Sequence, residues 1–149
     1  MNAARPDLAT VFERAPGLAQ RVAARIGADA AANEIVAAAR AELARMSEAE
    51  RIAVLDAHPR IGADPATLSA ASRREQAAGD DPATLRDLAT LNEEYERRFG
   101  FRFVVWVNGR SKSALIPVLR SRLRYDRERE LATGIAEFLA IALDRLRSR

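Results

Sequence analysis

The residues best suited to chemistry in this chain are a histidine, a carboxylate and an arginine in unusual places. His58 is the only histidine among 149 residues, and it precedes Pro59 in the stretch DAHPRIG. The ordinary pKa of an imidazole lies near neutrality, so this side chain suits proton transfer. The alternative is a structural histidine at a helix end, where a charged ring interacts with the carbonyl end of the helix dipole.

The second candidate is the segment SRREQ. Ser72 and Glu75 are three residues apart, and Ser72 and Gln76 are four apart. A helix would therefore place a hydroxyl, a carboxylate and an amide on one face. The alternative is an ordinary solvated face, with Arg73 and Arg74 as surface charges.

The third candidate is Arg145, which follows Ile141 by four residues and Phe138 by seven. It lies close to the apolar stripe of the last predicted helix, where it needs an anionic or hydrogen-bonding partner. The alternative is an arginine that extends its charge to solvent at the helix end. The three groups together suit a small anionic substrate, but their spacing alone does not bring them into contact.

The elements that must position these residues are predicted to be helices, because alanine, leucine, glutamate and arginine dominate the composition. Ser47 and Glu50 form a capping box before the helix that ends at His58. Asp126 and Ser111 are predicted helix caps, and Gly100 ends the clearest helix. The predicted helices cover two short segments within 6–27 that break at Pro16 and Gly17, and then 31–46, 47–58, 65–79, 82–100 and 112–123 (with Pro117 inside). A last helix follows Asp126, with an apolar stripe of Leu131, Ile135, Phe138, Ala142 and Leu146.

The segment FRFVVWV, residues 101–107, breaks the helical period and is rich in β-branched and aromatic residues. A single strand cannot form a sheet, so we expect a buried extended segment between helices. The prediction is an all-α fold: one domain over residues 1–149, built as a bundle of about eight helices around this segment.

Composition excludes several classes of protein. The chain has no cysteine and one histidine, so it cannot contain a disulfide and a zinc site is not expected. No apolar stretch approaches the roughly 20 residues of a membrane span, and the N-terminus lacks the apolar core of a signal peptide, so we expect a cytoplasmic protein without membrane contact. The 24 basic and 21 acidic residues leave a net charge of +3, which identifies no partner.

Four segments in this order resemble the family of 2-oxo-4-hydroxy-4-carboxy-5-ureidoimidazoline (OHCU) decarboxylases. They are HPRIG, SRREQ, LNEEYERRFGFRFVVWVNGRSK and EFLAIALDRL, and the resemblance covers residues 43–147. It implies an all-helical enzyme, commonly a homodimer, that needs no cofactor. The implied reaction converts OHCU, a small anionic substrate, to (S)-allantoin, which is the last step in the conversion of urate to (S)-allantoin.

The resemblance also implies roles for individual residues. His58 matches the catalytic histidine, and Glu75 matches the carboxylate that assists it as an acid/base. The residues that match substrate-binding positions are Pro59, Ser72, Gln76, Phe103, Val104, Val105 and Arg145. Among them, the segment 103–105 would bind the substrate through backbone groups, and Arg145 would hold its oxygen atoms.

Three other functions stay open at this point. A decarboxylase of a related ureide or imidazoline acid would use the same groups. A helical interaction protein would have a degenerate site, although the chain retains His58, Glu75 and Arg145. A nucleic-acid-binding module would use a basic cluster, which is interleaved with acidic residues and poor in aromatic ones. This cluster comprises Arg120, Arg122, Arg124, Arg127 and Arg129.

Overall fold

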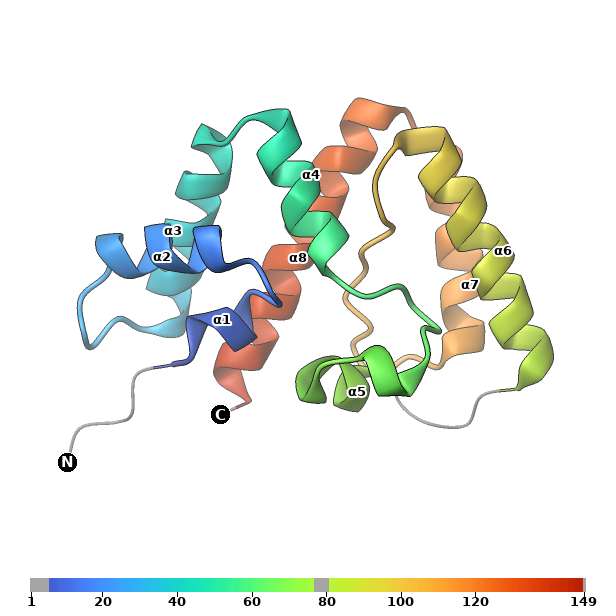
Figure 1. The fold of residues 1–149 in the computed structure, drawn as a ribbon, viewed down its shortest axis with the longest axis horizontal. Coiled ribbons are helices and arrows are strands. Elements are labelled where there is room, and N and C mark those ends of the chain that lie inside the picture. The colour runs from blue at the N-terminus through green and yellow to red at the C-terminus, as the bar shows by residue number, and fades with distance from the viewer. Residues whose placement is uncertain (1–5, 77–80, 149) are drawn as a thin grey trace.

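The computed structural model describes residues 6–76 and 81–148, and these ranges contain helices and no strand (Figure 1). The all-α prediction is therefore confirmed. In chain order the helices are α1 (Leu8–Val11), α2 (Pro16–Arg25), α3 (Ala32–Arg45), α4 (Glu48–Ala57), the 3-10 helix η1 (Pro65–Thr67), α5 (Ala70–Glu75), α6 (Pro82–Phe99), α7 (Lys112–Arg122) and α8 (Arg127–Arg147).

Helix α8 is the centre of the arrangement, since it contacts α1, α3, α4 and α6. In Figure 1 it runs between the α1–α4 group and the pair formed by α6 and α7. Its apolar stripe is buried, as the predicted positions Phe138 and Ala142 show with 1% and 0% exposure. Arg145 lies on the same buried side.

A glycine sets the distance between α4 and α8. A Cβ atom at Gly134 would lie 3.1 Å from Cδ1 of Leu55, which is tighter than an ordinary van der Waals contact. The absent side chain therefore lets α8 pack directly against the last turns of α4. This contact fixes the position of the helix that ends at His58.

The four helix caps predicted from the sequence are confirmed. Ser47 and Glu50 form the capping box of α4, and Ser111 accepts a hydrogen bond from the backbone of α7. Asp126 accepts one from the first turn of α8. Gly100 ends α6 in the left-handed conformation, with φ 81°, which glycine adopts without steric cost.

The segment 101–107 is extended and buried, as predicted. It follows Gly100 directly and runs between α8 and the α6–α7 pair (Figure 1). Its apolar side chains belong to the hydrophobic core. The buried residues of the segment are Phe101, Phe103, Val104, Val105 and Val107. Because the segment is neither helix nor strand, most of its backbone polar groups are not used by regular secondary structure.

Two predicted helix boundaries were wrong. The first break lies at residues 12–15, and Pro16 is the first residue of α2, where its missing N–H has no cost. The predicted helix 65–79 is divided into η1 and α5, because Ser69 is extended and caps α5 by accepting a hydrogen bond from the Ser72 N–H at 3.1 Å. Its predicted end at Gly79 lies outside the described residues.

None of the helices in the described ranges is long and apolar enough to cross a membrane.

Candidate active site

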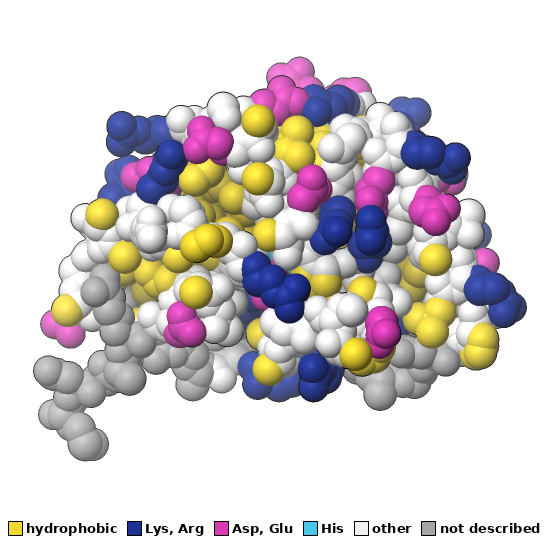
Figure 2. Space-filling model, in the orientation of Figure 1, with side chains coloured by type: hydrophobic (Ala, Val, Ile, Leu, Met, Phe, Trp, Pro, Cys, Tyr) yellow, Lys and Arg dark blue, Asp and Glu magenta, His cyan; other side chains and the backbone are white. Residues whose placement is uncertain are grey.

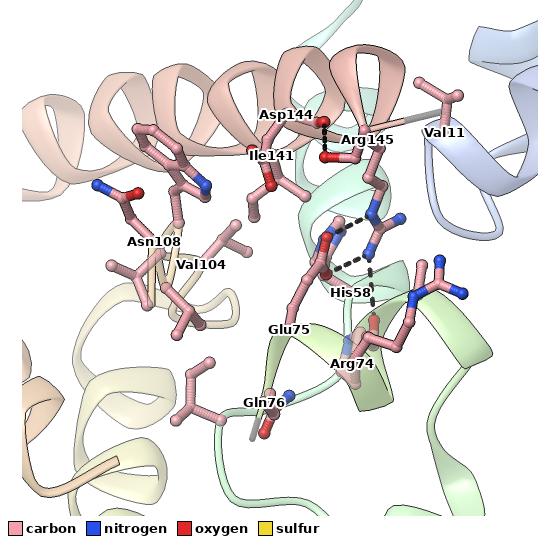
Figure 3. Close-up of a pocket in the computed structure, with 18 of the residues that line it drawn as sticks. Val11, His58, Arg74, Glu75, Gln76, Val104, Asn108, Ile141, Asp144 and Arg145 are labelled. Carbon is pink, nitrogen blue, oxygen red and sulfur yellow. Dashed lines mark hydrogen bonds and ion pairs between the residues drawn. The ribbon is translucent and has the colours of Figure 1, made fainter. Parts of the chain in front are cut away.

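A pocket of about 580 Å³ lies at the C-terminal end of α4, between α5, the segment 101–107 and α8. All the residues that the sequence singled out line this pocket, together with residues of α1 and the loop after Val107. Figure 3 shows Glu75 reaching from α5 toward Arg145 of α8, with His58 beside them. The sequence could not show this convergence, because the groups come from distant parts of the chain.

His58 is the C-cap residue of α4. Its backbone is extended (φ −74°, ψ 139°), which the following Pro59 favours. The ring is 6% exposed and meets the Phe138 ring edge-on at 5.5 Å. Among the described residues neither ring nitrogen has a hydrogen-bond partner.

The electrostatic environment keeps His58 neutral. Burial, followed by the positive charge of Arg145, lowers the pKa of the imidazole from 6.5 to about 4, and Glu13 opposes this shift. A charged ring that bonds to the carbonyl end of the helix, the alternative interpretation of this residue, does not match a buried ring whose nitrogens form no hydrogen bond among the described residues. A buried neutral ring with two unbonded nitrogens can accept a proton from a ligand.

Arg145 is buried and held by residues of two helices, α1 and α5. Its Nε and Nη2 donate to the two carboxylate oxygens of Glu75 at 2.9 and 2.8 Å. Nη2 also donates to the Ser72 hydroxyl at 3.2 Å, and Nη1 donates to the Thr10 carbonyl at 2.9 Å. With 9% exposure, this side chain does not extend to solvent, which excludes the alternative interpretation.

The hypothesis that Glu75 orients His58 is not matched by a hydrogen bond in the structure. Glu75 forms a two-pronged ion pair with Arg145, while the described residues leave both nitrogens of His58 unbonded. Glu75 therefore orients the guanidinium directly. It reaches the pocket beside the imidazole, as Figure 3 shows.

Ser72 and Gln76 are buried, so the solvated-face interpretation of SRREQ was wrong. Gln76 accepts a hydrogen bond from the Gly62 N–H at 2.8 Å and donates to the Arg60 carbonyl at 3.2 Å. These bonds hold the loop that follows His58 and Pro59. The Ser72 hydroxyl donates to Glu13, so its hydrogen is already used.

The segment Phe103, Val104 and Val105 forms one wall of the pocket. The Val104 carbonyl accepts a hydrogen bond of 2.6 Å from Nη1 of Arg122. The backbone N–H groups of the three residues have no partner among the described residues. Unbonded backbone donors beside a pocket are suited to bind the oxygen atoms of a ligand.

The sequence did not single out Glu13, a carboxylate with 2% exposure that touches both Ser72 and Arg145. In the stretch TVFERAP this acid follows the buried Phe12 and precedes the exposed Arg14. An acid beside an arginine between two helices is an ordinary surface pattern, so no local signal marked it. Its burial against polar partners is visible only in the structure.

Further features of the described residues bear on two alternatives, a metal site and a nucleic-acid-binding surface. In the described ranges no group of three or more potential ligands is arranged to hold a metal ion. Arg122, a member of the predicted basic cluster, is buried against Glu130, and Arg127 pairs with Glu48. The face in Figure 2 mixes basic and acidic side chains, which does not match the single-sign patch of a nucleic-acid-binding surface.

Comparison with known proteins extends the resemblance to the N-terminal part of the chain. Residues 2–147 match the family model of the OHCU decarboxylases. A 2-oxo-4-hydroxy-4-carboxy-5-ureidoimidazoline decarboxylase of Halalkalicoccus jeotgali is 33% identical over 104 residues, which are 67% of this chain and 58% of that protein. The corresponding decarboxylase of Haloferax volcanii is 28% identical over 143 residues, or 93% of this chain and 84% of that protein.

Other relatives are larger proteins. A uric acid degradation bifunctional protein of Bacillus subtilis is 34% identical over 92 residues, and this match covers 60% of the chain but 19% of that protein. The chain thus spans less than two thirds of several curated relatives. In fold it is similar to a crystal structure of OHCU decarboxylase in the presence of (S)-allantoin, with a TM-score of 0.76, 22% identity and 95% coverage of both chains.

Proposed function

This chain belongs to the OHCU decarboxylase family, and we propose that it converts OHCU to (S)-allantoin in urate degradation. The observation that carries the proposal is the pocket, which gathers every residue expected from the resemblance. A neutral base, a buried guanidinium and unbonded backbone donors surround one cavity. This set of groups suits an anionic substrate that is rich in oxygen.

The chemistry requires no electron sink from the protein. When the bond to the carboxylate breaks, its electrons pass into the adjacent ring C=N of the substrate, and CO2 leaves. The substrate hydroxyl loses a proton as its oxygen becomes a carbonyl. The ring takes up two protons, one at the nitrogen that received the electrons and one at the adjacent carbon, so that the hydroxyl supplies one of them and solvent supplies the other. We therefore propose a reaction without a cofactor, in which the protein orients the substrate and moves protons on one face.

His58 is the proposed acid/base. Because its pKa is lowered to about 4, the free protein holds a neutral ring at pH 7, so that a ring nitrogen can accept the hydroxyl proton. The negative charge of a bound substrate raises this pKa toward the operating pH, where proton transfer is most effective. Glu75 assists through Arg145, whose position it sets by two hydrogen bonds. A ring that has taken up one proton can return it to the substrate from the same side.

Arg145 and the segment 103–105 are the proposed groups that hold the substrate. A guanidinium has five N–H donors, and four of them bind Glu75 at two oxygens, Ser72 and Thr10. The remaining donor of Nη1 is left for a substrate oxygen. The backbone N–H groups of 103–105 then supply further donors for developing negative charge.

We also propose, from the resemblance, that the chain acts as a cytoplasmic homodimer and forms one domain over residues 1–149. Sedimentation equilibrium of the purified chain tests the oligomeric state. A dimer has twice the 16.3 kDa mass of one chain. A single species of 16.3 kDa at the assay concentration contradicts this part of the proposal.

The enzymatic test uses substrate made in place from urate with uricase and hydroxyisourate hydrolase, followed by circular dichroism. Added protein should produce optically active (S)-allantoin faster than the spontaneous decay, which gives a racemic product. His58→Asn should slow this production by about 10²- to 10⁴-fold, because it removes the proton acceptor. Glu42→Gln, which removes a carboxylate paired with Arg25 outside the pocket, is the matched control.

The same assay separates the remaining alternatives. No acceleration by the wild-type protein contradicts OHCU as the substrate. Related ureide and imidazoline acids then replace it in the assay, with CO2 release as the readout. Equal rates for wild type and His58→Asn would show that His58 is not the acid/base.

A further inference from the structure

The turn between α1 and α2 has an unusual backbone. Glu13 and Arg14 are both left-handed, with φ 44° and 57°, a conformation that residues other than glycine rarely adopt. The turn directs Glu13 inward, while Arg14 stays on the surface and donates to the Thr67 carbonyl at 3.2 Å. A rare conformation that buries a carboxylate indicates a specific requirement for that carboxylate.

The contacts of Glu13 are polar and come from two other helices. Its Oε1 accepts hydrogen bonds from the hydroxyls of Ser69, at 2.8 Å, and Ser72. The same oxygen lies 3.8 Å from Nη2 of Arg145. Since Ser69 caps α5 and Arg145 belongs to α8, one carboxylate joins the α1–α2 turn to both helices.

The Ser72 hydroxyl transmits the position of Glu13 to Arg145. A serine hydroxyl has one hydrogen, which it donates to Glu13. Its lone pairs therefore face Nη2 of Arg145, from which it accepts a hydrogen bond of 3.2 Å. Glu13 thus fixes the direction of the hydroxyl and, through it, one N–H of the guanidinium.

The charge of Glu13 is not needed to neutralise Arg145, because Glu75 already forms a two-pronged pair with it. The two carboxylates and one guanidinium leave a net negative charge beside His58. Arg145 lowers the pKa of His58 and Glu13 raises it, while Glu75 is engaged by Arg145. Replacing Glu13 by a neutral residue would therefore alter the field at the imidazole even where the packing is retained.

We propose that Glu13 is a positioning residue of this active site, which holds Arg145 and α5 in place and offsets the positive charge of Arg145 at His58. Glu13 does not line the pocket, so it acts through Ser72 and Arg145. The catalytic consequence rests on the proposed function, whereas the effect on His58 does not. The two consequences can therefore be measured separately.

The first measurement is NMR of the His58 ring in untagged protein, in which this residue supplies the only histidine signal. Glu13→Gln keeps the size of the side chain and removes its charge. Titrated from neutral pH to about pH 3, the ring in the variant should protonate at a pH lower than in the wild type by about half a unit or more. Glu42→Gln, which also removes a buried and paired carboxylate, should leave the His58 titration unchanged.

The second measurement is turnover. We expect kcat of Glu13→Gln to fall on the order of tenfold or more, because Arg145 and Glu75 lose their fixed geometry. The control Glu42→Gln should retain the wild-type kcat, even where it lowers the stability of the protein as much as Glu13→Gln does. Unchanged titration of His58 together with unchanged kcat overturns the proposal. An inactive wild-type protein contradicts the proposed function, while the NMR measurement still decides the role of Glu13.

A second variant covers the case in which Glu13→Gln does not fold. Ser72→Ala keeps both charges and removes the bridge between Glu13 and Arg145. Its His58 ring signals at neutral pH should move from the wild-type positions, and kcat should fall. Signals and kcat that match the wild type would overturn the proposal.

Discussion

Two buried arginines in this molecule have similar partners and opposite surroundings. Arg145 and Arg122 each bind a carboxylate and a backbone carbonyl, and their exposed fractions are 9% and 6%. Arg122 pairs with Glu130, which is fully buried, and lies 4.6 Å from the centre of the Phe103 ring. Arg145 instead faces a pocket and has two carboxylates close to it.

The difference distinguishes an ion pair that supports the fold from an arginine that belongs to the candidate active site. The pair of Arg122 and Glu130 is balanced in charge, and it supports the pocket wall from behind by holding the Val104 carbonyl. The cluster around Arg145 has a surplus negative charge and borders a neutral imidazole. We call Arg122 and Glu130 the sealed pair, and Arg145 with Glu13, Glu75 and Ser72 the open cluster. A buried pair of equal and opposite charges contributes to stability when both partners are present. A cluster that has a net charge and borders a pocket can respond to a ligand.

The largest expected effect is on the sealed pair. Arg122→Met should lower the free energy of unfolding by about 3–5 kcal/mol, because it leaves the Glu130 carboxylate buried without its ion-pair partner. Urea denaturation measures the loss. The double variant Arg122→Met, Glu130→Leu should recover most of it, and a loss below about 1 kcal/mol in the single variant would contradict the comparison.

The second effect is the pH dependence of stability. Folding lowers the pKa of His58 from 6.5 to about 4, so between these values the unfolded chain binds a proton that the native protein does not. The stability from the neutral ring is complete above pH 6.5 and is lost as the pH falls toward 4, by about 3 kcal/mol in total.

His58→Asn isolates this contribution. The wild type and the variant share all other titrating groups, so urea denaturation at several pH values should show a smaller decrease in the variant between pH 6.5 and 4. Parallel curves would mean that His58 titrates normally in the folded protein. Burial and the charges of Arg145 and Glu13 would then leave the pKa of the ring unshifted.

The third effect concerns the open cluster. Arg145→Lys should lower kcat/KM by about 100-fold, because an ammonium group cannot form the two-pronged pair with Glu75. Its loss of stability should be smaller than that of Arg122→Met, since the Glu75 side chain is 23% exposed and can be hydrated. The allantoin assay and urea denaturation measure the two quantities. A larger stability loss than that of Arg122→Met would reverse the comparison.

The smallest effect is at the edge of the sealed pair. The Tyr95 hydroxyl donates to Glu130 at 2.7 Å, and burial raises the pKa of this phenol, so it stays protonated. Tyr95→Phe should lower the free energy of unfolding by about 1–2 kcal/mol and leave kcat unchanged. Thermal unfolding and the allantoin assay together measure this outcome, and a lower kcat would place the sealed pair in the catalytic machinery.

Local signals in the sequence predicted most of the helices. The capping box at Ser47, the cap at Asp126 and the stop at Gly100 depend on a few adjacent residues, and the structure has all three. The break between η1 and α5 was missed because alanine and serine at 69–71 suit both a helix interior and a cap. Hydrogen bonds to Glu13 decide between the two, and these come from the distant α1–α2 turn.

The site was predicted less evenly. His58 and Arg145 were identified because a lone histidine and an arginine near an apolar stripe are unusual. Glu13 escaped notice because an acidic residue between helices is ordinary until its backbone conformation is known. The pairing of Glu75 with Arg145 depends on distances between α5 and α8, which no local pattern encodes.

The hydrogen bond between Arg145 and the Thr10 carbonyl joins residues that are 135 positions apart. Neighbouring pairs such as α2 with α3, and α6 with α7, contact each other over short stretches of chain and can associate early in folding. The pocket closes only when both ends of the fold meet, and we expect this to be a late event because the contact closes a long loop of chain. During refolding, enzymatic activity should therefore return later than the far-UV circular dichroism signal of the helices. The return of activity would report the completed native state.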